Sequence, residues 1–273
     1  MNLLYIMKNT KNVSPFLIAI IALASVITIV LLPIDTILIR MSLSGFHSEY
    51  IGLTIKMAFI FIISYRIIKK MKIESIAGFS SNYGWKFKYL NIIPIYLIII
   101  GILSIISKDL TQIHIENLLL LLFACLTVGF AEEFIFRGLL QSLFLKKYVS
   151  RKNGILISTL IPAIIFGLFH LINLIKNDNV LVVLIQVVFA MFIGFFFGVL
   201  VLKTNKIIPI AITHGLINFF FSIVFLPGIK VSEEMGFSIA PIIITLPLLI
   251  IGLIVVKKIK KEDVIKKLNE SFN

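Results

Sequence analysis

The sequence predicts an all-α protein that crosses a membrane about eight times, and three observations lead to this prediction. The chain is 59% hydrophobic with a mean hydropathy of +1.09, whereas soluble domains contain about 45–50% apolar residues. Only 14% of the 273 residues are charged, against about 25% in soluble domains. The apolar residues gather in long runs, as bilayer-spanning helices require. We therefore expect a polytopic membrane protein with one membrane domain over residues 1–273.

Eight apolar runs approach or exceed the ~20 residues that span a bilayer as a helix. The first is preceded by Lys8 and Lys11 and contains Ala22-Leu23-Ala24 in its interior. A signal peptide would carry such a small-residue motif after its apolar run, so we expect an uncleaved first span. The single cysteine, Cys125, excludes an internal disulfide. The runs comprise residues 15–34, 51–68, 89–107, 118–145, 154–172, 180–202, 207–226 and 238–256.

The basic residues alternate regularly between the two sides of the predicted bundle. Most of the 26 Lys and Arg residues lie near the termini and in the loops that follow the second, fourth and sixth runs. The positive-inside rule assigns these segments to the cytoplasm. This distribution predicts a protein of the cell membrane with both termini cytoplasmic and a basic tail over about residues 257–273. The net charge of +13 is then a topology signal and a contact with anionic lipids, and we expect no nucleic-acid partner.

The fourth run contains three charges, Glu132, Glu133 and Arg137. A charge at mid-membrane costs at least ~2.5–3.5 kcal/mol, and such residues usually mark a functional interior. Glu133 and Arg137 are four residues apart with the acid first, which predicts an ion pair along one helix. Glu132 is rotated by about 100° and has no basic partner on its own helix. A buried carboxylate without a partner accepts protons readily, so we assign Glu132 as a general base. The alternative is that the three charges only hold helices together.

Two later runs carry histidines at helical spacing. Phe166 and His170 share one face of the fifth run, and His214 and Asn218 share one face of the seventh. A lone intramembrane histidine is often only an interhelical hydrogen bond. Two histidines in the same half of the chain as a buried glutamate instead indicate a site, with a catalytic core over about residues 118–220.

Two further patterns concern packing and the membrane surface. Gly194 and Gly198 form a G-x-x-x-G motif in the sixth run, which permits close helix approach. We interpret it as packing inside the bundle rather than as a dimerisation surface. Residues 83–89 mix aromatic residues with lysines, which predicts an anchor at the membrane interface. Substrate gating is the alternative role for this segment.

The motifs E-E-x-x-x-R, F-x-x-x-H and H-x-x-x-N on successive predicted helices resemble the CPBP family. That family groups type II CAAX prenyl endopeptidases with bacteriocin-processing and immunity enzymes, and the resemblance covers roughly residues 118–220. It implies that Glu132 and His170 activate a water molecule. It also implies that His214 and Asn218 stabilise the oxyanion of the tetrahedral intermediate, at ~2.7–4 kcal/mol per donor. The residues expected to support the site are Glu133, Arg137 and Phe166.

The cofactor is open at this stage. Glu132, His170 and His214 could hold a divalent metal such as zinc with one position left for water. No H-E-x-x-H motif is present, and the three ligands would come from three helices. Asn218 is a good neutral donor and a poor metal ligand. We favour activation of water without a metal.

We therefore expect an intramembrane endopeptidase that hydrolyses a peptide bond of a membrane-associated or peptide substrate. One alternative is a non-catalytic bacteriocin-immunity or peptide-binding protein on the same fold. A second is a proton-coupled transporter that uses Glu132 and the histidines as a relay. Transporters usually show paired broken helices in two halves, whereas the polar residues here lie only in the second half. The identity of the substrate, its prenylation and the oligomeric state are open.

Overall fold

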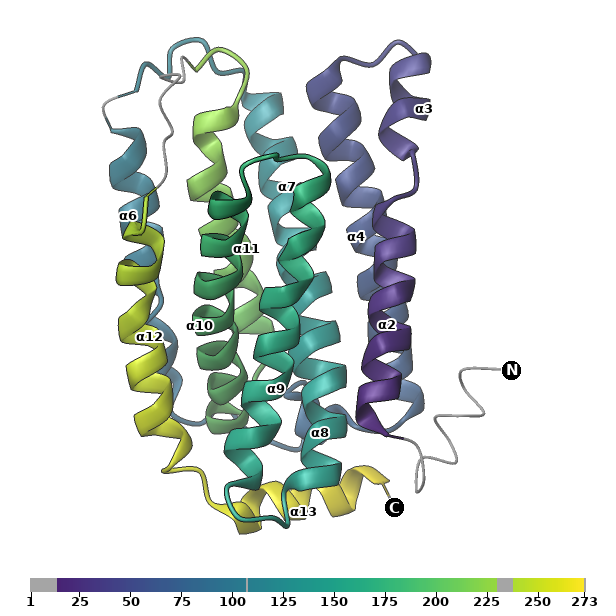
Figure 1. Ribbon diagram of the computed structural model, residues 1–273, viewed down its shortest axis with the longest axis vertical. Helices are drawn as coiled ribbons and strands as arrows, with labels where there is room; N and C mark the ends of the chain where they lie inside the picture. Colours follow the sequence, from purple (N-terminus) through teal and green to yellow (C-terminus); the bar gives the residue numbers. More distant parts are fainter. Residues whose placement is uncertain (1–13, 107, 230–237, 273) are drawn as a thin grey trace.

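The computed structural model describes residues 14–106, 108–229 and 238–272, and these residues form a helical bundle without strands. Most helices follow one long axis, and the short helix α13 lies across one end (Figure 1). The all-α prediction is confirmed. The elements are α2 (Pro15–Val30), α3 (Ile34–Arg40), α4 (Gly45–Lys70), α5 (Glu74–Ala77), η1 (Lys88–Ile92), α6 (Ile95–Ile105), α7 (Ile115–Glu133), η2 (Phe134–Leu140), α8 (Gln141–Tyr148), α9 (Gly154–Phe169), η3 (His170–Ile175), α10 (Val180–Thr204), α11 (Ile208–Ser222), η4 (Ile223–Phe225), α12 (Ala240–Val256) and α13 (Lys261–Phe272).

The predicted number of spans agrees with the bundle. Among the described residues, seven helical segments are long and apolar enough to cross a membrane. The count rises to eight if α12 and α13, which are bent by 85° relative to each other, form one span. The start of α2 and the helix α13 lie at the same end of the bundle (Figure 1), as an even number of crossings requires. The assignment of this end to the cytoplasm stays a prediction.

The fourth span is longer and less regular than predicted. It runs from Ile115 to Tyr148, and its middle part, η2, is a π-helix. Every residue of η2 is buried. π-Helical turns are rare and occur frequently at functional sites. The irregularity begins directly after Glu133, so the two adjacent carboxylates lie at the junction between an α-helix and a π-helix.

Two glycines bring α7 and α11 into backbone contact. A Cβ atom on Gly129 would lie 2.4 Å from the carbonyl oxygen of Ala211. A Cβ atom on Gly215 would lie 2.8 Å from the Cα of Leu126. Any side chain at either position would separate the helices. This close approach places His214, the neighbour of Gly215, beside the end of α7.

The G-x-x-x-G motif of α10 packs inside the bundle, as predicted. Both glycines are buried, and their carbonyl oxygens accept hydrogen bonds from the fourth span. Arg137 Nε donates to Gly194 at 3.4 Å, and Gln141 Nε2 donates to Gly198 at 3.0 Å. A Cβ atom on Gly194 would lie 2.8 Å from Arg137 Nη2, so glycine leaves the space that the guanidinium occupies.

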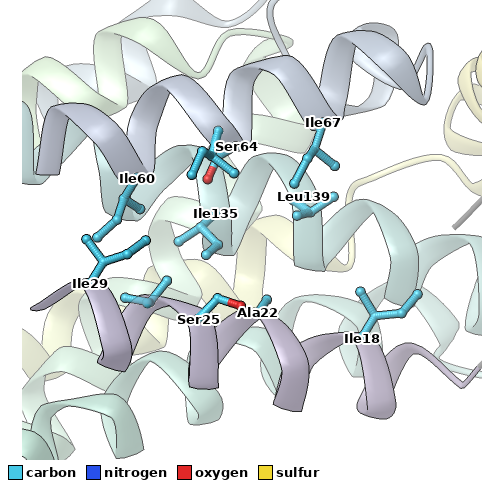
Figure 2. A pocket seen from close by; sticks show the side chains of 11 residues that line it. Ile18, Ala22, Ser25, Ile29, Ile60, Ser64, Ile67, Ile135 and Leu139 are labelled. Carbon is cyan, nitrogen blue, oxygen red and sulfur yellow. The ribbon is translucent and has the colours of Figure 1, made fainter. Parts of the chain in front are cut away.

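A cavity of about 250 Å³ separates α2 from α4 beside the π-helix. The side chains of Ile135 and Leu139 point from η2 into this space (Figure 2). The remaining walls are mostly aliphatic, and among the described residues the polar side chains in the lining are Ser25 and Ser64. In this cavity, which we call the apolar cavity, none of the described lining residues could transfer a proton near neutral pH.

Candidate active site

Four of the predicted residues form a continuous chain of contacts between the fourth span and α11. Arg137 Nη1 lies 2.9 Å from Glu133 Oε1. The same Oε1 lies 2.8 Å from His214 Nδ1. His214 Nε2 lies 3.5 Å from Glu132 Oε2. The predicted ion pair is confirmed, but Glu133 also contacts His214, a contact that the sequence did not predict.

The central ion pair is withdrawn from solvent. The side chains of Glu133 and Arg137 are 0% and 2% exposed, whereas that of Glu132 is 14% exposed. Removing one partner of a buried ion pair leaves an uncompensated charge, which is strongly destabilising. The guanidinium also lies over the ring of Phe166, 4.3 Å from the centroid. Glu133, Arg137 and Phe166 therefore form one packed unit next to His214.

The contacts of His214 constrain where protons lie. A carboxylate paired with an arginine only accepts hydrogen bonds, so Nδ1 carries the proton and donates it to Glu133. Nε2 then faces the carboxyl group of Glu132. The two groups lie 3.5 Å apart, so a proton on Nε2 would point toward this carboxylate.

His170 differs from His214, because one of its two ring nitrogens does not face a carboxylate and is left as an acceptor in the neutral ring. Its Nδ1 lies 2.9 Å from the carbonyl oxygen of Phe166, which can only accept, so Nδ1 carries the proton. In the neutral ring, Nε2 then has a free lone pair. The ring is held edge-on against Phe166 at 4.9 Å between centroids. His170 begins η3, directly after the last residue of α9.

His170, His214, Asn218 and Phe166 all line one cavity of about 440 Å³ among α9, α10, α11 and α12. This size is typical of small-ligand pockets. The other wall residues are largely apolar. Glu132 is not part of the cavity wall and joins the group through its contact with His214. We call this space the histidine cavity.

One polar residue of the histidine cavity was missed in the sequence. Gln186 lies in the cavity wall, and its Oε1 accepts a hydrogen bond from Asn173 Nδ2 at 2.8 Å. A signal existed, because Gln186 is the only polar side chain in the apolar run 180–202. An isolated polar residue in a membrane span commonly faces a functional interior.

The predicted metal ligands do not form a metal-binding group. Within the described part of the chain, no three His, Cys, Asp or Glu side chains are arranged to hold a metal ion. Of the three candidates, His170 and His214 share the cavity, and Glu132 lies outside its wall, 3.5 Å from His214 Nε2. Both nitrogens of His214 already face carboxylates. The donor set therefore does not fit a tetrahedral zinc site.

Comparison with known proteins agrees with the motifs. Residues 114–220 match the family model described as type II CAAX prenyl endopeptidase Rce1-like. This segment contains every residue predicted for the site. No curated protein and no solved structure matches the chain. Residues 114–220 are therefore similar to the Rce1-like type II CAAX prenyl endopeptidases, which agrees with the resemblance to the CPBP family, and the apolar helices are those of a multi-pass membrane protein.

Proposed function

We propose that the protein is an intramembrane endopeptidase that cleaves a peptide bond held in the histidine cavity. The observation that carries this proposal is that His214 contacts Glu132 and lines a cavity that also holds His170 and Asn218. The family match over residues 114–220 supports the same reaction class. The substrate is a peptide or protein segment that enters from the membrane.

Water activation is assigned to Glu132 and His170. In the neutral ring of His170, Nε2 is an acceptor, because Nδ1–H is bound to a backbone carbonyl. A water molecule that donates a hydrogen bond to this nitrogen becomes more nucleophilic, and proton transfer of this kind contributes about 10²–10⁴-fold to a rate. The oxygen attacks the carbonyl carbon, and the proton passes to the base. The same proton then moves to the amine that leaves when the C–N bond breaks.

Stabilisation of the oxyanion is assigned to His214 and Asn218. Both lie on α11, one helical turn apart, and both line the cavity. When His214 is protonated, Nε2 is a donor, and the amide of Asn218 supplies a second one. Glu133 holds the ring of His214 through Nδ1, so the donor is oriented before the substrate binds. Preorganised donors of this kind are worth ~2.7–4 kcal/mol each.

Metal-free activation of water is part of the proposal, and it is supported by the absence of a three-ligand group among the described residues. Elemental analysis of purified, active protein tests it. We expect less than one equivalent of any transition metal and no loss of activity during a chelator titration. Activity that disappears with the chelator and returns with zinc would contradict metal-free catalysis.

The proposal also includes the orientation of the chain in the membrane. We place both termini in the cytoplasm, because lysines occupy the last turns of α4, α8 and α10 and directly follow α12, and these helix ends lie at the end of the bundle that carries α13 (Figure 1).

The experiment that tests the proposed function maps new protein termini in cells by mass spectrometry. Cells that express the wild-type protein are compared with cells that express Glu132→Gln. We expect cleavage products of membrane proteins that depend on Glu132. The matched control is Glu116→Gln, an identical change on the exposed first turn of α7. A non-catalytic immunity or peptide-binding protein would give the same termini in all three strains, which would contradict the proposal.

A further inference from the structure

A third cavity, of about 360 Å³, lies where α10 ends and α12 turns into α13. The segment before η1 closes its remaining side. Its lining contains six lysines and only one carboxylate, that of Asp263. We call it the lysine cavity. Its lysines are Lys86, Lys203, Lys258, Lys260, Lys266 and Lys267.

The positive charge of the lysine cavity is only partly offset by the carboxylates near it, Asp263 and Glu270. Lys203 Nζ donates to the carbonyl oxygen of Lys258 at 2.9 Å, and Lys267 Nζ donates to Asn205 Oδ1. Both acceptors are uncharged. None of the ion pairs within the described residues joins a lysine of this cavity to a carboxylate. Clustered charges of one sign in a cavity focus the electric field there and attract ions of the opposite sign. A cavity lined by lysines therefore attracts anions.

Two of these lysines are held in place rather than freely solvated. Lys267 is only 6% exposed, and its ammonium lies over the ring of Tyr83 at 5.1 Å. Lys203 lies over the ring of Phe87 at 4.3 Å. Burial, together with the nearby charge of Lys86, lowers the pKa of Lys267 to about 8. A lysine is rarely buried without a charged partner, and within the described residues Lys267 forms no salt bridge with a carboxylate, so an anion in this cavity would stabilise it.

The aromatic residues beside the lysine cavity indicate the source of that anion. Trp85, Phe87 and Tyr89 are 47%, 43% and 61% exposed. Exposed aromatic rings next to lysines are typical of the membrane–water interface. The cavity therefore lies at the level of lipid head groups, and basic pockets between spans at this level are suited to anionic lipids. The interfacial anchor predicted for residues 83–89 is then one wall of a binding site.

We propose that the lysine cavity binds the phosphate group of an anionic phospholipid from the adjacent leaflet. The lysines supply charge-assisted hydrogen bonds to the phosphate oxygens, and the exposed rings contact the glycerol and acyl region. This site is separate from the histidine cavity and does not depend on the proposed peptidase activity. Free inorganic phosphate has the same recognition chemistry, so the test must separate the two sources.

The test measures retention of single lipids by the full-length protein in detergent, using native mass spectrometry. The probes are phosphatidylglycerol, phosphatidylcholine and inorganic phosphate. The test variant combines Lys86→Gln, Lys258→Gln and Lys266→Gln. The matched control combines Lys70→Gln, Lys147→Gln and Lys152→Gln, which removes the same charge from exposed positions outside the cavity. Circular dichroism and the triple arginine variant at the test positions check that the fold is kept.

We expect the wild type to retain phosphatidylglycerol in preference to phosphatidylcholine. The test variant should weaken this binding roughly 100-fold, from about 1 kcal/mol per lysine, and the control variant by less than threefold. The arginine variant should restore it. Equal weakening by both glutamine variants would indicate diffuse attraction and overturn the proposal. Equal retention of both lipids would also overturn it, as would full displacement of the lipid by millimolar inorganic phosphate.

Discussion

The apolar cavity and the histidine cavity both depend on the fourth span, yet they differ in chemistry. The apolar cavity is lined by Ile135 and Leu139 of η2 together with α2 and α4 (Figure 2). The histidine cavity lies among α9 to α12 and contacts the carboxylates of the fourth span through His214. One buried segment thus presents aliphatic side chains to the first helices of the chain and charged side chains to the later ones. Substitutions of residues that face only one of the two cavities should therefore separate stability from catalysis, whereas Glu133, which holds the buried ion pair, should affect stability.

The largest expected loss of stability follows Glu133→Ala. The substitution leaves Arg137 buried and unpaired and removes the partner of His214 Nδ1. Breaking a buried ion pair on one side costs about 3–5 kcal/mol, and we expect the midpoint of thermal unfolding in detergent to fall accordingly. The paired variant Glu116→Ala, on the exposed start of α7, should change it little. An unfolding midpoint equal to that of the wild type would show that the ion pair is not structural.

The next largest effect is on catalysis alone. Asn218→Ala removes one proposed oxyanion donor from the histidine cavity, so kcat should fall by about 10²–10³-fold. Because Asn218 is only half-buried, the unfolding midpoint should stay close to that of the wild type. Peptide hydrolysis and thermal unfolding measured on the same preparation check both parts. A fall in kcat of less than tenfold would remove Asn218 from the proposed mechanism.

The opposite pattern is expected for Ile135→Ala in the apolar cavity. Ile135 is 5% exposed, and deleting a buried aliphatic side chain costs about 2–5 kcal/mol. Because Ile135 borders the apolar cavity, it has fewer contacts to lose than a fully packed residue. We therefore expect the free energy of unfolding to fall by about 2 kcal/mol. The activity of each folded molecule should be unchanged. Loss of activity without loss of stability would show that the two sides of the fourth span are coupled.

The smallest expected effect concerns the lysine cavity and pH. Lys267 has its pKa lowered to about 8, so it is charged below that pH and neutral above it. Anion binding favours the charged form, and lipid retention should weaken by about tenfold between pH 7 and pH 9. Tyr83, whose pKa is raised to about 12 by burial and Glu270, does not titrate in this range. The other charged groups that act on Lys267 are Lys86, Asp263 and Glu270.

The control for this pH dependence is Lys267→Met. It should bind the lipid more weakly than the wild type at pH 7 but show no further loss up to pH 9. A variant with the same pH dependence as the wild type would assign the titration to another group.

The membrane spans and the ion pair of Glu133 and Arg137 were predictable because both depend on local sequence patterns. Bilayer thickness sets the length of apolar runs, and helical spacing alone predicts the pair of Glu133 and Arg137. The contact between Glu133 and His214 was not predictable in this way. It joins α7 to α11 and depends on backbone contact at Gly129 and Gly215, which is a tertiary property.

Other features lay beyond the sequence for different physical reasons. The π-helix at residues 134–140 has no distinct residue pattern, because its extra residue per turn is stabilised by packing around it. The first span extends beyond the predicted run 15–34, because α3 (Ile34–Arg40) follows α2 (Pro15–Val30) after a short break that includes Pro33. From the sequence, we interpreted the lysines of the lysine cavity only as a signal of membrane orientation. The sequence does not show that residues 83–89 lie next to the end of α12, which is a tertiary contact. Gln186 could have been found from its isolation in an apolar run.

The central claim is that Glu132 acts in peptide hydrolysis, and one measurement tests it directly. A peptide that contains a cleavage site found by terminus mapping is incubated with purified wild type, Glu132→Gln and Glu116→Gln. We predict that kcat/KM falls at least ~100-fold for Glu132→Gln and stays at the wild-type value for Glu116→Gln, with both variants folded. Hydrolysis by Glu132→Gln at the wild-type rate would contradict the account.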